Sequence, residues 1–177
     1  MSGQEWLREV EEVIGSTSSE LVELLRQSVA SAGRKESTKA FADSLGLARG
    51  VTGYSLHTVP VAIHAWLTHS GDYEKAVSSV IECGGDADTT AAIVGGIVGA
   101  GVGKEGIPRL WLESMTDWPR SAAWIEGLGR DLAAAIRSGS PESSKVPEVS
   151  FIASIARNMF FLLVVLFHGF RRLAPPY

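Results

Sequence analysis

The sequence predicts an all-α protein, and three observations support this fold class. Apolar residues recur at intervals of three and four along most of the chain, which is the period of helices with one buried face. Cap residues, prolines and glycines separate these segments at the positions where helices begin and end. No segment alternates apolar and polar residues convincingly, as a half-buried strand would. We therefore expect an orthogonally packed multi-helix domain, followed by a hydrophobic C-terminal helix.

The first two expected helices lie within residues 17–45. Thr17 and Glu20 have the spacing of a capping box, and apolar residues then recur at helical period as far as Gly33. Ser37 to Leu45 predicts a second, short helix, which a glycine closes.

Five more helices complete the expected domain, and three of them begin at a proline. Proline suits the first helical position because its missing amide hydrogen has no partner there. The expected helices begin at Pro60, near Tyr73, at Ala91, at Pro108 and at Pro119, and the last ends near Arg137.

The expected helix from Ala91 to Gly103 carries glycines at every fourth position: Gly95, Gly99 and Gly103. Glycine lowers the stability of a helix interior, so we expect these residues to allow neighbouring helices to approach closely. The apolar run is about a dozen residues, which is too short to span a bilayer. A buried central helix is the better interpretation.

Length and composition restrict the class of protein. The 177 residues are 45% hydrophobic and 20% charged, as in one folded globular domain with a sizeable core. A net charge of −4 gives no support to nucleic-acid binding. The single cysteine, Cys83, excludes an intramolecular disulfide and favours a reducing, cytoplasmic location, with the thiol buried. The glutamate-rich N-terminal segment is not a signal peptide.

The composition changes after the expected domain, which covers residues 1–137. Residues 138–150 are rich in Pro and Ser and predict a flexible linker. Residues 151–177 predict a hydrophobic and basic helix, with the basic excess of the chain concentrated there.

This C-terminal helix has some features of a membrane anchor, with possible contact through residues 151–172. An unbroken apolar run from Met159 to Phe167 is followed by Arg171 and Arg172. Three polar residues shorten the apolar stretch to about half of what spanning requires: Arg157, Asn158 and His168. A tail anchor, a helix lying on the membrane surface and a helix docked on the domain all stay open.

The candidate functional site is the segment Gly84 to Thr89, whose sequence is GGDADT. Asp86, Asp88 and Thr89 bring two carboxylates and a hydroxyl within four positions. Their oxygens would converge on one point if they formed the first turn of the following helix. Sites with only oxygen ligands suit Mg²⁺, Mn²⁺ or Ca²⁺, not zinc or copper. Ordinary helix capping is the alternative, because Asp and Thr are common N-cap residues.

This segment and its surroundings resemble the C-terminal metal motif of the ADP-ribosylglycohydrolase family. The family's pattern is G-G-D-x-D-[TS], then small and apolar residues, then I-P-x-x-W, which here is Ile107 to Trp111. Upstream, His57 to Ile63 is similar to the family's helix before the motif. The resemblance covers roughly residues 51–124.

The resemblance implies an all-α hydrolase that cleaves the glycosidic bond between ADP-ribose and a protein side chain or small-molecule acceptor. It implies two Mg²⁺ or Mn²⁺ ions, with Asp86, Asp88 and Thr89 as C-terminal ligands and Asp88 bridging the ions. The partners would be ADP-ribosylated proteins or small molecules that contain ADP-ribose. No residue is assigned as the catalytic acid or base, and the residues expected to line the substrate site are Gly53, Tyr54, His57, Val59 and Gly85.

Two other motifs of the family do not occur in this sequence. They are a G-D-x-x-G segment and a T-D-D-T cluster, which complete the dimetal site from the N-terminal half. We therefore expect the chain to correspond to the C-terminal half of a family member, with a separate N-terminal half as a partner. A non-catalytic remnant or a membrane-tethered binding module is the alternative.

Overall fold

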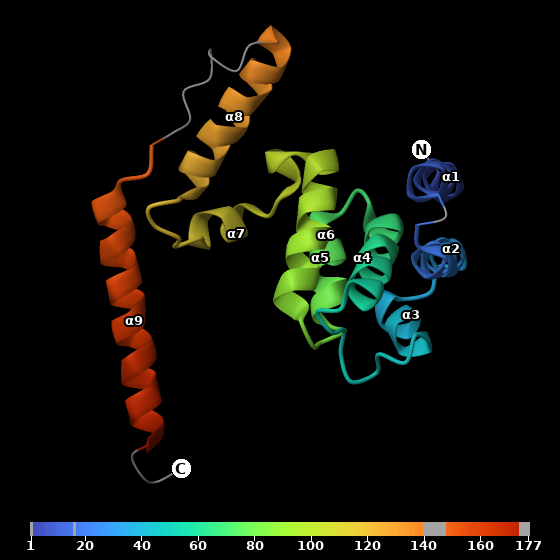
Figure 1. Cartoon of the computed structure of the whole chain (residues 1–177), viewed down its shortest axis with the longest axis horizontal. Helices are drawn as coiled ribbons and strands as arrows, with labels where there is room; N and C mark the ends of the chain where they lie inside the picture. The colour runs from blue at the N-terminus through green and yellow to red at the C-terminus, as the bar shows by residue number, and fades with distance from the viewer. Residues whose placement is uncertain (1, 16, 140–147, 174–177) are drawn as a thin grey trace. The chain divides into compact units, whose positions relative to one another are not determined.

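A computed structural model describes residues 2–15, 17–139 and 148–173. These residues form nine α-helices and no strand, so the predicted all-α class is confirmed (Figure 1). The chain divides into two compact units, Met1–Arg109 and Leu110–Tyr177. Most of the predicted linker, residues 140–147, lies outside the described residues, and the predicted domain boundaries stay predictions.

The first unit begins with α1 (Gly3–Ile14), a helix with a complete capping box. The Glu5 amide donates to Ser2 Oγ at 3.2 Å, and the Ser2 amide donates to Glu5 Oε2 at 2.7 Å. Sequence reasoning assigned no cap here, although Ser2 and Glu5 have the required spacing.

The second helix, α2 (Ser19–Gly33), ends at the predicted residue but begins differently. Its N-cap is Ser18, whose Oγ accepts a hydrogen bond from the Leu21 amide at 3.4 Å. The predicted capping box of Thr17 and Glu20 is therefore wrong by one residue. Adjacent Thr and Ser residues are both good caps, and the spacing alone did not distinguish them.

After α3 (Thr38–Ser44), helix α4 (Ser55–His69) begins one turn before the predicted start at Pro60. Thr58 Oγ1 donates to the Thr52 carbonyl at 2.8 Å, and the His57 amide donates to the Tyr54 carbonyl at 2.8 Å. An amide at Pro60 would have paired with a carbonyl in the first turn, so only one helical hydrogen bond is lost. The helix continues through the proline for this reason.

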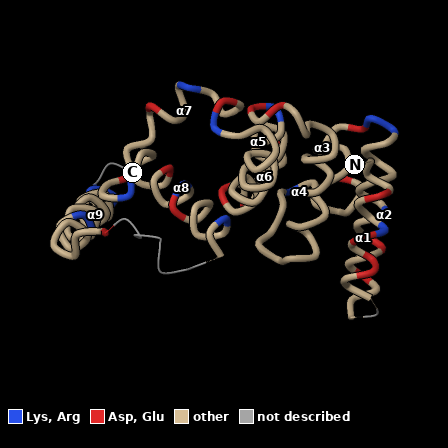
Figure 2. The backbone as a smooth tube through the Cα atoms, turned by 90° about the horizontal axis from the view of Figure 1, so that it is seen from above, with Lys and Arg blue, Asp and Glu red and all other residues tan. Residues whose placement is uncertain are grey.

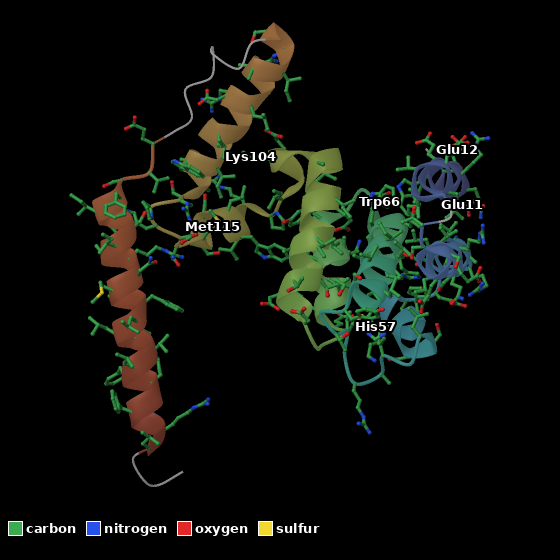
Figure 3. All side chains as sticks on the ribbon, viewed as in Figure 1. Glu11, Glu12, His57, Trp66, Lys104 and Met115 are labelled. Atoms are coloured by element: carbon green, nitrogen blue, oxygen red, sulfur yellow. The ribbon has the colours of Figure 1, made fainter. Side chains whose placement is uncertain are left out.

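Helix α4 is central to the first unit and packs against α2, α3, α5 (Tyr73–Ile81) and α6 (Ala87–Val102) (Figure 1). Two apolar clusters cover it. The first lies between α3, α4, α5 and α6 and comprises Phe41, Ala42, Leu47, Val51, Val61, Ala62, Ala65, Ala76, Val80, Cys83, Val94 and Val98. The second lies between α1, α2 and α4 and comprises Leu7, Leu25, Val29 and Ile63, with Trp66 (Figure 3) packed beside both clusters.

The glycines of α6 explain its close packing on α5. A Cβ atom added to Gly95 would lie 2.8 Å from Tyr73 Oη, and one added to Gly99 would lie 3.5 Å from Tyr73 Cε2. The tyrosine ring therefore occupies the space beside both glycines, as the expectation of close helix approach requires. Gly103 has a different role, since it ends the helix with a φ of +69°.

A polar group is buried between α2, α3 and α4. His64 is fully buried, with Nε2 3.1 Å from Ser31 Oγ and Nδ1 3.3 Å from Thr38 Oγ1. Ser31 Oγ also donates a hydrogen bond to Glu36, and Thr38 Oγ1 donates one to Ser79 Oγ. The His64 ring also stacks on Phe41 at a centroid distance of 4.6 Å. Burial lowers the pKa of His64 from 6.5 to about 4.

We expect His64 to make the protein less stable as the pH falls from 6.5 towards 4. The unfolded chain protonates this imidazole near pH 6.5, whereas the folded chain does so only near pH 4. Within this window the unfolded state binds more protons, so the free energy of unfolding rises with pH. Above pH 6.5 the imidazole is neutral in both states, and no further stability is gained. The difference across the window amounts to about 3 kcal/mol.

Chemical denaturation on either side of this window checks the effect. The neutral substitution His64→Gln should flatten the pH dependence between the two conditions, and His168→Gln on exposed α9 is the control. Equal slopes in the native protein and in His64→Gln would contradict the assignment. Glu36 affects the stability of the protein at lower pH, because hydrogen bonds from Arg34 and Ser31 lower its pKa from 4.5 to about 2.

The second unit contains α7 (Arg109–Ser114) apart from its first residue, then α8 (Ala122–Ser138) and α9 (Phe151–Leu173). α7 begins directly after Pro108, as predicted. α8 begins later than the predicted Pro119, because Ser121 Oγ accepts from the Trp124 amide at 3.3 Å and caps the helix. α9 is long and apolar enough to cross a membrane, judged by length and composition alone.

Candidate metal and substrate site

Two loops that are far apart in sequence are joined by hydrogen bonds directly before the start of α6. Val51, in the loop before α4, and Gly85, in the loop before α6, form an isolated parallel bridge. The Val51 amide donates to the Gly84 carbonyl at 3.0 Å, and the Asp86 amide donates to the Val51 carbonyl at 2.6 Å. Val51 is buried in the first apolar cluster, so the bridge is attached to the core.

Asp86 is the N-cap residue of α6, but its side chain makes no capping hydrogen bond. Its carbonyl oxygen instead accepts from Thr90, from the amide at 3.1 Å and from Oγ1 at 2.8 Å. Thr90 is fully buried, so the helix start is held from inside the core. The alternative explanation of Asp86 as an ordinary side-chain cap is therefore wrong.

The second carboxylate lies beside the first at the exposed start of α6. A hydrogen bond with the Asp86 side chain, followed by those from the Thr89 and Asp88 amides, lowers the pKa of Asp88. Thr89 is exposed next to them, whereas its neighbour Thr90 points into the core. The positive end of the α6 dipole also favours the ionised form of Asp88.

Gly53 brings the first loop close to the carboxylates. A Cβ atom added to Gly53 would lie 2.7 Å from Asp86 Oδ2. Any larger residue would therefore displace the Asp86 carboxylate or the loop. Sequence reasoning included Gly53 and Gly85 among the site residues and missed Gly50 and Val51. A Cβ atom added to Gly50 would lie 2.5 Å from the Gly85 nitrogen, and Val51 forms the bridge with Gly85.

Tyr54 and His57 lie at the start of α4, directly after this loop. The exposed Tyr54 ring meets the His57 ring edge to face, with centroids 5.2 Å apart. His57 (Figure 3) is held by Thr52, whose Oγ1 lies 2.8 Å from Nδ1. Tyr54 and His57 thus contact each other directly after Gly53, which lies beside Asp86, and their contact with a substrate stays a prediction.

Val59 and Cys83 lie apart from these exposed groups. Val59 packs against the second apolar cluster, on the far side of α4 from the first. Cys83 is buried, its Sγ donates to the Ser79 carbonyl at 3.3 Å, and burial raises the pKa of the thiol. The thiol therefore has the structural role that its sequence position suggested.

The donor atoms of the site fit a hard divalent cation. Asp86, Asp88 and Thr89 offer only oxygens, and the Asp86 carboxylate is not used as a cap. Among residues 2–15, 17–139 and 148–173, no group of three or more His, Cys, Asp or Glu side chains is placed to hold a metal. The described residues therefore place two carboxylates and one hydroxyl at the start of α6.

Comparison with known proteins agrees with the motif. An uncharacterized protein of Archaeoglobus fulgidus is 40% identical over 63 residues, which are 36% of this chain and 20% of that protein. The matched segment thus spans about a fifth of the relative's length. No solved structure matches the chain. The ADP-ribosylglycohydrolase family profile matches residues 2–142, which include both loops, α4 and α6. This chain belongs to the ADP-ribosylglycohydrolase family.

Proposed function

We propose that this chain holds the C-terminal part of the metal centre of a hydrolase. The enzyme would cleave the glycosidic bond between ADP-ribose and a protein side chain or a small-molecule acceptor. The observation that supports this most directly is Asp86, a helix N-cap whose carboxylate caps no amide and lies beside Asp88. A carboxylate pair of this kind is otherwise costly, because like charges repel unless a cation or proton lies between them.

Each residue of the site has a distinct role in this proposal. Asp86 and Asp88 would bind the cations through carboxylate oxygens, and Thr89 would add its hydroxyl. Gly53 leaves room for the Asp86 carboxylate, and the exposed ring of Tyr54 offers a surface for stacking of a base or ribose. The His57 ring is oriented by Thr52 and can hydrogen-bond a substrate hydroxyl or phosphate through its other nitrogen.

Two Mg²⁺ or Mn²⁺ ions, when bound, would orient the ribose diol, polarise the scissile bond and lower the pKa of a water molecule. The hydrogen bonds from the Asp86 amide to Val51 and from Thr90 to the Asp86 carbonyl would hold the backbone of Asp86 while such ions bind. A preorganised arrangement reduces the cost of reaching the reactive geometry.

Divalent binding by the chain itself tests the metal assignment. With three protein ligands the affinity for Mn²⁺ should be weak, in about the millimolar range, because Mg²⁺ and Mn²⁺ sites with few charges keep several waters. Asp88→Ala should abolish binding in titration calorimetry, while Asp43→Ala on the exposed surface of α3 should not change it. Tight binding that survives Asp88→Ala would place the ions elsewhere and overturn the assignment.

A non-catalytic binding module is the second candidate. It is favoured by the small number of acidic ligands among the described residues. Such a module would bind ADP-ribose without cleaving any ADP-ribosylated substrate, even when the N-terminal motifs of the family are supplied on a second polypeptide. The hydrolase proposal expects cleavage under that condition.

A further inference from the structure

The long helix α9 has one polar face, although its composition is mostly apolar. At 3.6 residues per turn its polar side chains all fall within an arc of about 140°. They are Ser154, Arg157, Asn158, His168, Arg171 and Arg172. In the middle of the helix, apolar residues occupy the same arc. The polar side chains therefore lie near the two ends of the helix.

The opposite face of α9 is apolar from end to end and exposed. Its large side chains are between 44% and 79% exposed: Phe151, Ile152, Ile155, Met159, Phe160, Leu162, Leu163, Leu166, Phe167, Phe170 and Leu173. No residue of the most apolar window of this helix is buried. An apolar face of this length is far larger than the scattered apolar residues of an ordinary protein surface.

The rest of the second unit is attached to α9 through its polar face. Arg157 donates from Nε and Nη2 to Asp117 Oδ1, at 3.0 and 2.8 Å, and Asp117 lies between α7 and α8. Residues from this loop and from the flank of α9 beside Arg157, which includes Phe160 at the border of the apolar face, also line a hollow of about 650 Å³: Thr116, Asp117, Trp118, Ala156, Arg157, Phe160 and Phe161. Attachment on this side leaves the centre of the apolar face uncovered.

A membrane-spanning orientation does not suit this arrangement. The 23 residues of α9 could extend for about 35 Å, which exceeds the hydrocarbon thickness of about 30 Å. The Arg157–Asp117 ion pair, however, lies on the seventh residue of the helix and would enter the hydrocarbon. Between Met159 and Phe167 the uninterrupted apolar run would cover only about 14 Å.

The charge of α9 indicates which surface would cover its apolar face. The helix contains Arg157, Arg171 and Arg172 and no acidic residue, although the whole chain has a net charge of −4 (Figure 2). Arginines at the edge of a long apolar face are typical of helices that lie on anionic lipid. We propose that α9 lies in the plane of an anionic membrane surface, with the apolar face in the acyl boundary and Arg171 and Arg172 at the headgroups.

Flotation of the full 177-residue chain with lipid vesicles tests this proposal. The chain should float with mixed vesicles of phosphatidylcholine and phosphatidylserine and bind much less to phosphatidylcholine alone. The double substitution Arg171→Gln/Arg172→Gln should weaken binding to the anionic vesicles by about 30-fold. Binding should also fall as the salt concentration rises, because the electrostatic part of the attraction is screened.

Two neighbouring substitutions identify the face that enters the lipid. Leu163→Gln, on the apolar face, should weaken vesicle binding by about tenfold or more. Val164→Gln removes a similar apolar side chain from the polar arc and should change binding by less than about twofold. The helicity of each variant, measured by far-UV circular dichroism, controls for loss of structure.

Three outcomes would overturn the proposal. Equal weakening by Leu163→Gln and Val164→Gln, with resistance to extraction at alkaline pH, would indicate a spanning helix. Absence of vesicle binding together with a dimer in sedimentation velocity would show that a second copy covers the face. Absence of vesicle binding by a monomeric chain would show that neither lipid nor a second copy does so.

Discussion

The purified 177-residue chain is expected to release no ADP-ribose above background from an ADP-ribosylated protein, with either Mg²⁺ or Mn²⁺. Two cations bring four positive charges, whereas Asp86 and Asp88 bring two negative ones. No third His, Cys, Asp or Glu is grouped with them among the described residues. Proton transfer to the leaving group also needs a positioned acid, which contributes about 10²–10⁴-fold in typical enzymes.

The control for this result is the addition of a second polypeptide that carries the two missing motifs of the family. A separately expressed polypeptide with the family's G-D-x-x-G and T-D-D-T segments should restore release in the presence of the metal, and Asp86→Ala should remove it again. Metal-dependent release by the 177-residue chain alone, lost in Asp86→Ala, would overturn this expectation. Release that persists in Asp86→Ala would point to a contaminating hydrolase.

Substitution of Gly85 by alanine is expected to unfold the site and destabilise the whole first unit. The new Cβ would lie 2.1 Å from the Val51 carbonyl oxygen and 2.6 Å from the Val51 nitrogen, so the bridge could not form. The φ of Gly85 is +79°, which adds a penalty of about 1–2 kcal/mol for a residue with a side chain. Two backbone hydrogen bonds to Val51 would also be lost, so we expect about 3–5 kcal/mol of destabilisation in total.

The neighbouring Gly84 offers a matched control. Its φ is similar at +72°, but a Cβ atom there would meet nothing within 4 Å. Gly84→Ala should therefore cost only about 1–2 kcal/mol from the backbone conformation. Thermal and denaturant unfolding of both variants measures the difference. Equal destabilisation would mean that the bridge between the loops adds no stability beyond the glycine conformation.

The sequence alone was sufficient for the parts of the fold that depend on neighbouring residues. The spacing of apolar residues and the glycines at the helix ends predicted α2, α3, α5 and the body of α6. This was possible because the helical period involves residues only three or four positions apart. The proximity of Asp86 and Asp88 at the start of α6 was predicted for the same reason, since one helical turn brings these residues together, and their role as metal ligands stays a prediction. Errors at the helix starts also had local causes, such as the choice between Thr17 and Ser18 as the cap.

The surroundings of the motif depended on contacts between distant residues. Gly50 and Val51 have no periodic pattern and lie more than thirty positions before Gly85, so nothing local indicates that they meet. The start of α4 before Pro60 likewise depends on how the loop before it folds. No local pattern marks His64 as buried, and only the packing of α2 and α3 against α4 shows that it is.

The sequence determined the helical class, the family motif around Asp86 and the composition of the C-terminal helix. The tertiary structure decided that Asp86 caps no amide, that Gly53 lies against its carboxylate, and that α9 is attached by Arg157 on its polar side. The physical reason is the range of the interactions. Helical hydrogen bonds join residues four positions apart, whereas the bridge, the carboxylate environment and the exposed face depend on segments that only folding brings together.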